Sequence, residues 1–352
     1  MVTADQLPTF GPAAAPPAGR RLLARALTRP SLAALLALVV VVAVFGVRSP
    51  ALLGSAGGAA VLDAAATLGI GGVAVALLLV AGQFDLSIGV VGVGSALVSA
   101  LLIQEAGWGT WPALLISLAC ALVVGLINGA LVVSTGMPSF LATLATFLVL
   151  DGATVAGAHL LTGTVTIDGL QSAPGWRSAA AVFDSTVRLG NGTFHVAVLW
   201  CVAATALASW VLWRTKFGNA VMASGGARRA ARELGVHVRR TTITLFCLTA
   251  TAGWLIGAIG LLRSGGVQVS PGLGQDVDFL VVAVIGGCLL GGGYGSPVGA
   301  AVGALLYGVA REGIVLAGWD PRWFQTLLGV LLVVALLANG VVRSRLKAVP
   351  RS

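Results

Sequence analysis

The segment VAVALLLVAGQFDLSIGVVGVGSALVSALL, residues 73–102, consists of two long apolar runs separated by a short polar stretch. The polar stretch holds Gln83 and Asp85, in a chain in which only 9% of the residues are charged. A carboxylate near the centre of a membrane helix costs about 2.5–3.5 kcal/mol on insertion scales. Because Gly82 and Gly89 flank it, we expect the helix to break here and the freed backbone groups to be buried in protein or to face water.

The composition of the whole chain is that of a membrane protein. Of its 352 residues 57% are hydrophobic, and the mean hydropathy is +0.99, which excludes a soluble domain. The 49 glycines allow helix backbones to approach closely in lipid. The net charge of +9 comes from arginines at helix ends rather than along one face, so nucleic acid is not expected as a partner.

Apolar runs of roughly 17–25 residues, the length of one crossing, predict about ten transmembrane helices. They lie near residues 31–47, 60–81, 87–104, 111–134, 139–158, 194–213, 243–262, 277–290, 297–317 and 324–342. The first run follows four arginines, as in a signal peptide, but its length and the nine later spans favour a retained first helix. No metal is expected, because the four cysteines, Cys120, Cys201, Cys247 and Cys288, lie in apolar runs without CxxC spacing.

These spans define one transmembrane domain, residues 31–342. Residues 1–30 begin with a Pro/Ala-rich stretch and are expected to form a disordered tail, and residues 343–352 a second tail. Two longer connections separate spans, residues 159–193 and residues 214–241. The first is polar enough to fold outside lipid, and either a docking surface for an external partner or a passive cap fits it.

Basic residues indicate the orientation through the positive-inside rule. With ten spans both termini lie on the same side as residues 214–241, and that side carries Arg20, Arg21, Arg25, Arg29, Arg214, Lys216, Arg228, Arg229, Arg232, Arg239, Arg240, Arg343, Arg345, Lys347 and Arg351. The other side carries Arg48, Arg177, Arg188, Arg263 and Arg322. Both termini are therefore expected in the cytoplasm.

The stretch SGGARRAARELGVHVRR, residues 224–240, predicts a short amphipathic helix in the cytoplasmic connection. Gly225 and Gly226 precede it, and Gly235 stands at the position of a left-handed C-terminal cap. A smooth apolar stripe is formed by Ala227, Ala230, Ala231 and Leu234, with Arg228, Arg229 and Arg232 on the remaining arc. Contact with anionic lipid is one interpretation; because alanine buries little apolar area, we prefer a close-fitting groove on a protein.

A second helix break is predicted in GGCLLGGGYGS, residues 286–296, because Gly-interrupted helices are typical of transport paths. Residues assigned to the path or to a break are Gln83, Asp85, Ser87, Gly286, Gly287, Gly291, Gly292 and Gly293. Asp85 either contacts solute hydroxyls or, with Ser87, caps the following helix. The second role is favoured because residues 82–87 lie toward the cytoplasmic end of the predicted spans.

Four blocks of this sequence resemble the permease subunits of ribose-type sugar ABC importers. They are GQFDLSIG (82–89), NGALVVSTGMPSFLATLATFLVLDG (128–152), ASGGARRAARELGVHV (223–238) and VDFLVVAVIGGCLLGGGYGSPVGAAVGALL (277–306). They occur in the family's order within residues 60–340. The sequence departs from the family pattern at Gln83 (a glycine), Ser139 (a proline), Asp151 (a basic residue) and Ala227 (an asparagine), which leaves the solute open.

The resemblance implies a type II ABC importer-like permease in the bacterial plasma membrane. It also implies a second permease subunit, identical or different, a pair of cytoplasmic ATPase subunits and an external solute-binding protein that delivers sugar. Residues 225–235 would then be the coupling helix seated on the ATPase. The chain itself contains no GxxxxGK[ST], so ATP and Mg²⁺ are expected on the partner.

Two other classes of protein are alternatives to the importer. An ion-coupled secondary transporter would use Asp85, Asp63 or Asp151 as its proton carrier, but it has no need of a cytoplasmic docking helix. An intramembrane enzyme would need a nucleophile with a base or a metal set, and the sequence has no HExxH or paired-carboxylate motif. A neutral small solute, with a monosaccharide foremost, is the expected cargo, since the sequence shows no ring of like charges.

Overall fold

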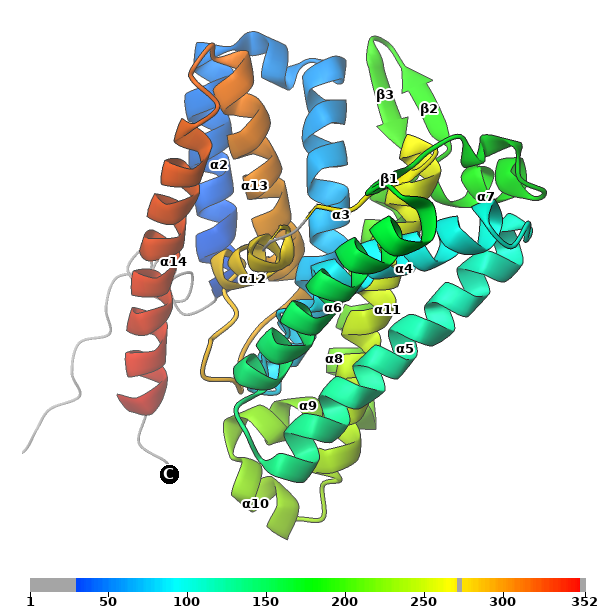
Figure 1. The fold of residues 1–352 in the computed structure, drawn as a ribbon. Helices are drawn as coiled ribbons and strands as arrows, with labels where there is room; N and C mark the ends of the chain where they lie inside the picture. The colour runs from blue at the N-terminus through cyan, green and yellow to red at the C-terminus, as the bar shows by residue number, and fades with distance from the viewer. Residues whose placement is uncertain (1–29, 271–273, 349–352) are drawn as a thin grey trace, which may run out of the picture.

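The computed structural model describes residues 30–270 and 274–348, which form one helical bundle (Figure 1). Its long helices are α2 (Pro30–Arg48), α3 (Ser55–Val80), α4 (Ile88–Gln104), α5 (Thr110–Thr135), α6 (Ser139–Thr162), α8 (Ala197–Arg214), α11 (Val238–Ser264), α13 (Pro297–Leu316) and α14 (Trp323–Ala348). Shorter elements are η1 (Pro50–Leu53), β1 (Thr166–Ile167), η2 (Leu170–Ser172), α7 (Trp176–Phe183), β2 (Thr186–Leu189), β3 (Gly192–His195), α9 (Lys216–Gly226), α10 (Arg228–Glu233), β4 (Val267–Gln268) and α12 (Asp276–Ile285).

A helix lies at each of the ten predicted spans. Seven are long and apolar enough to cross a membrane, namely α3, α5, α6, α8, α11, α13 and α14, and α2 and α4 are shorter apolar helices. The predicted span 277–290 is wrong in length, because α12 has ten residues. At 1.5 Å per residue it is about 15 Å long, half the thickness of a hydrocarbon core.

The ends of the chain lie partly outside the described residues. Residues 1–29 of the predicted first tail and residues 349–352 of the second are not described. The predicted second tail starts at residue 343, but α14 continues to Ala348, so the first residues of that tail are helical.

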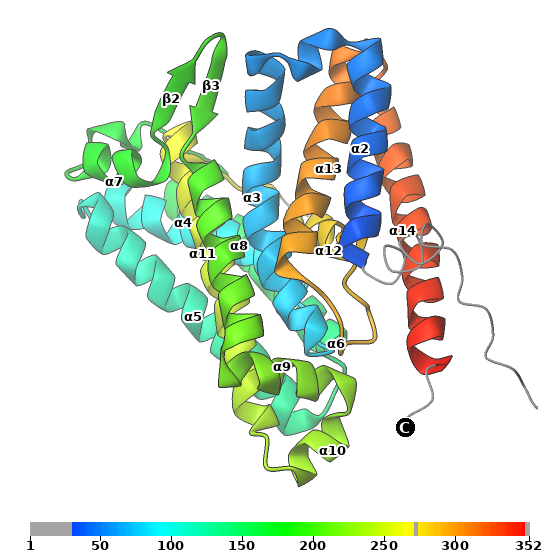
Figure 2. The same ribbon diagram turned by 180° about the vertical axis from the view of Figure 1, so that it is seen from behind.

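Helix α3 is the centre of the bundle. It lies between α13 on one side and α8 and α11 on the other (Figures 1 and 2), and it is buried from Leu68 to Val80. The outer helices instead expose large apolar side chains, among them Leu115, Val149, Val202 and Leu337. A surface of this kind suits lipid, in which apolar side chains need no further cover.

The connection between α6 and α8 is a folded unit rather than an open loop. Its strand β1 pairs with β4, which follows α11, and β2 and β3 form an antiparallel hairpin. The rings of Phe183 and Trp200 stack with centroids 5.6 Å apart, which anchors α7 on α8. Because α6 ends only at Thr162, the folded part begins later than the expected residue 159.

The connection between α8 and α11 lies at the opposite end of the bundle from the β2–β3 hairpin (Figure 2). It is helical throughout most of its length and contains α9 and α10. The predicted single helix over residues 225–235 is therefore wrong in its bounds. Gly225 and Gly226 end α9, Ala227 separates the two helices, and Leu234 follows the end of α10.

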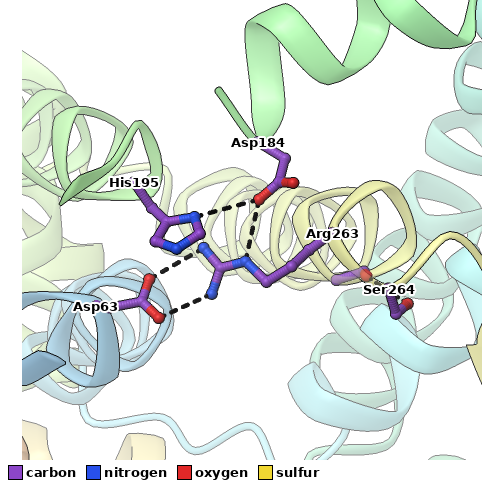
Figure 3. Close-up of polar contacts among 6 residues, drawn as sticks. Asp63, Asp184, His195, Arg263 and Ser264 are labelled. Atoms are coloured by element: carbon purple, nitrogen blue, oxygen red, sulfur yellow. Dashed lines mark hydrogen bonds and ion pairs between the residues drawn. The ribbon is translucent and has the colours of Figure 1, made fainter. Parts of the chain in front are cut away.

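A cluster of charged residues fastens the α6–α8 connection to the bundle (Figure 3). At the end of α11, Arg263 forms a two-point ion pair with Asp63 of α3, at 3.0 and 3.1 Å. Its Nε also donates to Asp184, which follows α7, at 3.1 Å. On the same carboxylate, Oδ1 lies 3.4 Å from Nδ1 of His195. Arg263 thus joins two central helices to the folded connection.

Replacing Arg263 by alanine is expected to loosen this connection, because Asp63 and Asp184 would lose their shared cation. Trypsin sites at the exposed Arg177 and Arg188 should then be cleaved roughly fivefold faster, as expected for loss of about 1 kcal/mol of local stability. Limited proteolysis in detergent measures this rate. Arg322→Ala is the control, because its ion pair is exposed and 3.9 Å long; equal cleavage of the two variants would contradict the anchoring role.

Candidate functional site

The polar stretch after α3 is a helix break of defined geometry. Gly82 has φ +70°, its amide donates to Leu79, and the amide of Gln83 donates to Leu78 at 3.0 Å, which is a Schellman cap. The following residues up to Ser87 are not helical, and Gln83 and Asp85 are buried, each 6% exposed. The chain is therefore not helical between Val80, where α3 ends, and Ile88, where α4 begins.

Side chains of α6 satisfy the backbone of this break. The amide of Phe84 donates to Oγ of Ser139 at 2.8 Å, and the amide of Leu86 donates to Oγ1 of Thr143 at 3.1 Å. Irregular backbone inside a membrane protein is tolerated when its polar groups are paired in this way. Ser139 replaces a proline of the family pattern, and a proline would supply no such acceptor.

Asp85 holds the turn that leads into α4. Its Oδ1 accepts from the amide and hydroxyl of Ser87, at 2.8 and 2.7 Å, and its Oδ2 accepts from Thr249 of α11 at 2.6 Å. The hydroxyl of Ser87 accepts from Asn128 of α5, whose Oδ1 accepts from Thr146 of α6. Both carboxylate oxygens are therefore engaged in connecting helices.

The carboxylate that caps α4 is Asp276, not Asp85. From the first turn of α12, Oδ1 of Asp276 accepts from the amides of Gly89 at 2.6 Å and Val90 at 3.2 Å. These amides have no partner within α4, and the positive end of a helix favours a negative charge. The expectation that Asp85 caps the next helix is corrected accordingly: it fixes the preceding turn, and the cap comes from 187 residues away.

The second predicted break has the same construction. Helix α12 ends at Ile285, and Gly287, with φ +94°, and Cys288 donate to Val284 and Ala283 in a second Schellman cap. The exposed Gly291 and the turn residues Gly292 and Gly293 follow, with φ +77° and +78° at the last two. The next helix, α13, begins where the Ser296 hydroxyl accepts from Gly299. Buried Gly286 lies in backbone contact with Gly299, which brings the ends of α12 and α13 together.

The two breaks and the end of α9 meet through their backbones. The amide of Gly293 donates to the carbonyl of Val80 at 2.8 Å. A Cβ on Gly292 would lie 2.7 Å from Cα of Gly82, and one on Gly293 would lie 2.9 Å from Cα of Gly226. A Cβ on Gly225 would fall on the Val80 carbonyl. We name these three segments, residues 80–87, 225–226 and 286–296, the glycine junction.

Beyond the junction, α10 is exposed on most of its surface. Ala231 is buried, whereas Ala227, Ala230 and Leu234 are exposed, so the predicted stripe is partly uncovered. Gly235 has φ +80° within a third Schellman cap, as predicted.

The three arginines of α10 differ in their surroundings. Arg228 is half-buried, and desolvation, followed by the charge of Arg232, lowers its pKa. Arg229 pairs with Glu233 at 3.6 Å on the exposed face, and Arg232 is exposed. The side chains available to a partner are therefore those of Arg229 and Arg232.

A bundle of apolar helices with two interior breaks and an exposed helical connection is the architecture of a membrane permease. Residues 57–336 match the family model described as branched-chain amino acid transport system / permease component, and the chain belongs to this family.

Its relatives include sugar import permeases. The chain is 33% identical to the fructose import permease protein FrcC of Rhizobium meliloti over 80% of its own length and 77% of the relative's. It is 28% identical to the galactose/methyl galactoside import permease protein MglC of Escherichia coli K12 (67% and 69%), and 26% identical to the ribose import permease protein RbsC of the same strain (87% and 92%). The search of solved structures gave no significant match.

The adjacent glycines of α9 provide a matched pair for testing the junction. Gly225→Ala places a methyl group on the Val80 carbonyl and is expected to destabilise the protein by about 1–3 kcal/mol, the usual effect of overpacking. Gly226→Ala is expected to be tolerated, since its Cβ would lie 4.0 Å from the nearest atom, Cα of Gly293. Thermal unfolding of the purified variants measures the difference, and equal stability would refute the contact.

Proposed function

We propose that this protein is the permease subunit of an ATP-binding-cassette importer for a neutral small solute, with a monosaccharide as the expected cargo. The observation that carries the proposal is the glycine junction, because it joins the end of α9, which directly precedes the exposed α10, to both helix breaks. A force on α10 would then reach the breaks without passing through flexible side chains. The names of the relatives, which refer to fructose, galactose and ribose, support a sugar.

The partner at this end would be a cytoplasmic ATPase subunit with a groove for α10. Ala230 and Leu234 supply a small apolar face, and Arg229 and Arg232 supply positive charge beside it. Since the sequence has no nucleotide-binding loop, hydrolysis of ATP belongs to that partner and this subunit has no enzymatic role.

Other partners follow from the same assignment. The folded α6–α8 connection, at the opposite end, would receive an extracytoplasmic solute-binding protein. The exposed apolar faces would contact lipid and a second permease subunit, in a homodimer or a heterodimer. The distribution of basic residues supports a position in the bacterial plasma membrane with both termini in the cytoplasm. The C-terminal end of α14 and the α9–α10 segment lie toward the same end of the bundle, in agreement with this orientation (Figure 1).

An ion-coupled secondary transporter is the second candidate. Of its proposed proton carriers, Asp85 accepts from Ser87 and Thr249, and Asp63 is paired with Arg263. Asp151 lines a cavity and is the observation that favours this candidate. A proton gradient, rather than ATP, would then drive uptake.

Co-purification with the neighbouring ATPase subunit tests the proposal. Arg232→Glu should reduce the amount of ATPase recovered about tenfold or more, because it reverses a charge on the docking face of α10. The exposed Arg322→Glu, at the opposite end, is the control for charge reversal.

The transport readout separates the two candidates. Liposomes containing the wild-type complex should take up solute when ATP is supplied on the side of α10. A permease that purifies without any ATPase and moves solute down a proton gradient would refute the importer assignment in favour of the secondary transporter.

A further inference from the structure

An apolar groove of about 260 Å³ runs along the side of the bundle between α8 and α11, with α3 as its floor. Both outer helices pack on α3. The lining extends from Trp200 to Val211 on α8 and from Leu248 to Leu255 on α11. At its rim Leu207 is 60% exposed and Leu248 is 38% exposed, so the groove is open to the surroundings of the bundle.

The surface of this groove suits hydrocarbon rather than a sugar. Among the described residues that line it, the polar side chains are those of Trp200 and Thr251. The indole of Trp200 donates to the carbonyl of Val182 at 2.9 Å, and the hydroxyl of Thr251 donates to the carbonyl of Cys247 at 2.8 Å. A sugar in the groove would lose the hydrogen bonds that its hydroxyls make to water, which is costly, whereas an acyl chain has none to lose.

The length of the groove is close to that of one membrane leaflet. Between Trp200 and Val211 the axis of α8 rises about 17 Å, at 1.5 Å per residue, and half of a hydrocarbon core is about 15 Å. At one end the ring of Trp200 stacks on Phe183 of the folded α6–α8 connection. The other end points toward α9, which packs on both α8 and α11. One acyl chain, extending from the membrane surface on the α9 side, therefore has the length to fill the groove.

Two exposed arginines lie beyond the α9 end of the groove. On α8, Arg214 follows Leu207 at i+7, on the face that lines the groove. On α11, Arg240 precedes Leu248 by eight residues, and the exposed Thr244 lies between them on the same face. Among the described residues neither arginine has an ion-pair partner. Their charges are thus available to a ligand at this end.

The surroundings of these arginines do not offset their charge. From the start of α8 to the end of α11 the sequence has one acidic residue, Glu233, and it pairs with Arg229 on α10 at 3.6 Å. At 1.5 Å per residue Arg214 lies about 5 Å beyond the groove and Arg240 about 12 Å beyond it, along their helix axes. Long basic side chains at such positions reach the headgroup layer. Trp210, 58% exposed near the end of α8, is of the residue type that lies at this level.

We propose that the groove between α8 and α11 is a binding site for an anionic phospholipid, with one acyl chain lying along α3 and the headgroup held by Arg214 and Arg240. Arginine forms charge-assisted, bidentate hydrogen bonds with phosphate. Two uncompensated positive charges favour a headgroup of net negative charge over a zwitterionic one. The inference needs a chain embedded in a membrane, but neither the proposed ATPase nor the proposed cargo.

Native mass spectrometry of the full-length permease in mild detergent tests the headgroup contacts. The protein is mixed with equal amounts of phosphatidylglycerol and phosphatidylcholine that carry the same acyl chains, and the ratio of the two lipids in the first adduct is measured. We expect phosphatidylglycerol to be retained in preference, and Arg214→Gln and Arg240→Gln each to lower the ratio about fivefold. Arg239→Gln is the matched control, because this exposed neighbour lies about 100° around α11 from Arg240, away from the groove.

Filling the groove tests the acyl-chain contact in the same experiment. Ala203 lines the groove and is exposed, so Ala203→Phe should occupy it without disturbing the core and should lower the retention of both lipids alike. Leu199→Phe, on the same helix but outside the lining, should leave retention unchanged.

Three results would overturn the inference. The first is a ratio that Arg239→Gln lowers as much as Arg214→Gln and Arg240→Gln do, because the preference would then reflect the overall charge. The second is unchanged retention of lipid by Ala203→Phe. The third is a shift from dimer to monomer in Ala203→Phe, since the groove would then hold a second permease subunit.

Discussion

The structure depends on one constraint, that every backbone polar group buried in a membrane has to be paired, since each unpaired group costs several kcal/mol. Between α3 and α4 the chain leaves helical geometry while most of its residues are buried. Ser139 and Thr143 accept from its amides, Asp85 accepts from Ser87, and Asp276 caps the start of α4. Because these acceptors come from α6 and α12, the break fixes the relative positions of several helices.

The same constraint explains why glycine dominates the meeting point of the two breaks. Val80 still has a carbonyl to satisfy at the end of α3, and the amide of Gly293 reaches it only because the approaching segments have no Cβ. The end of α9 joins this contact through Gly225. A rigid backbone junction between the end of α9 and the two helix breaks is a direct mechanical connection, whereas side chains would absorb small displacements by changing rotamers.

Much of this was predictable from the sequence because the signals are local. The lengths of the apolar runs indicate where the ten helices lie, and the glycines indicate both breaks and the cap at Gly235. The predictions failed where a distant segment decides the outcome. Asp276 caps α4 from another helix, and Gly225, at the end of α9, packs against the Val80 carbonyl of α3. The supporting role of Ser139 had a signal, namely its departure from the family pattern, but its partner lies 55 residues away.

Hydrogen–deuterium exchange of the assembled complex, with and without ATP, tests the central claim that α9, α10 and the two breaks respond together. The measured peptides are residues 78–87, 216–236 and 286–296. If the glycine junction is rigid, exchange in all three changes when ATP binds, although neither break is part of the proposed ATPase site. A change confined to residues 216–236 would contradict the account.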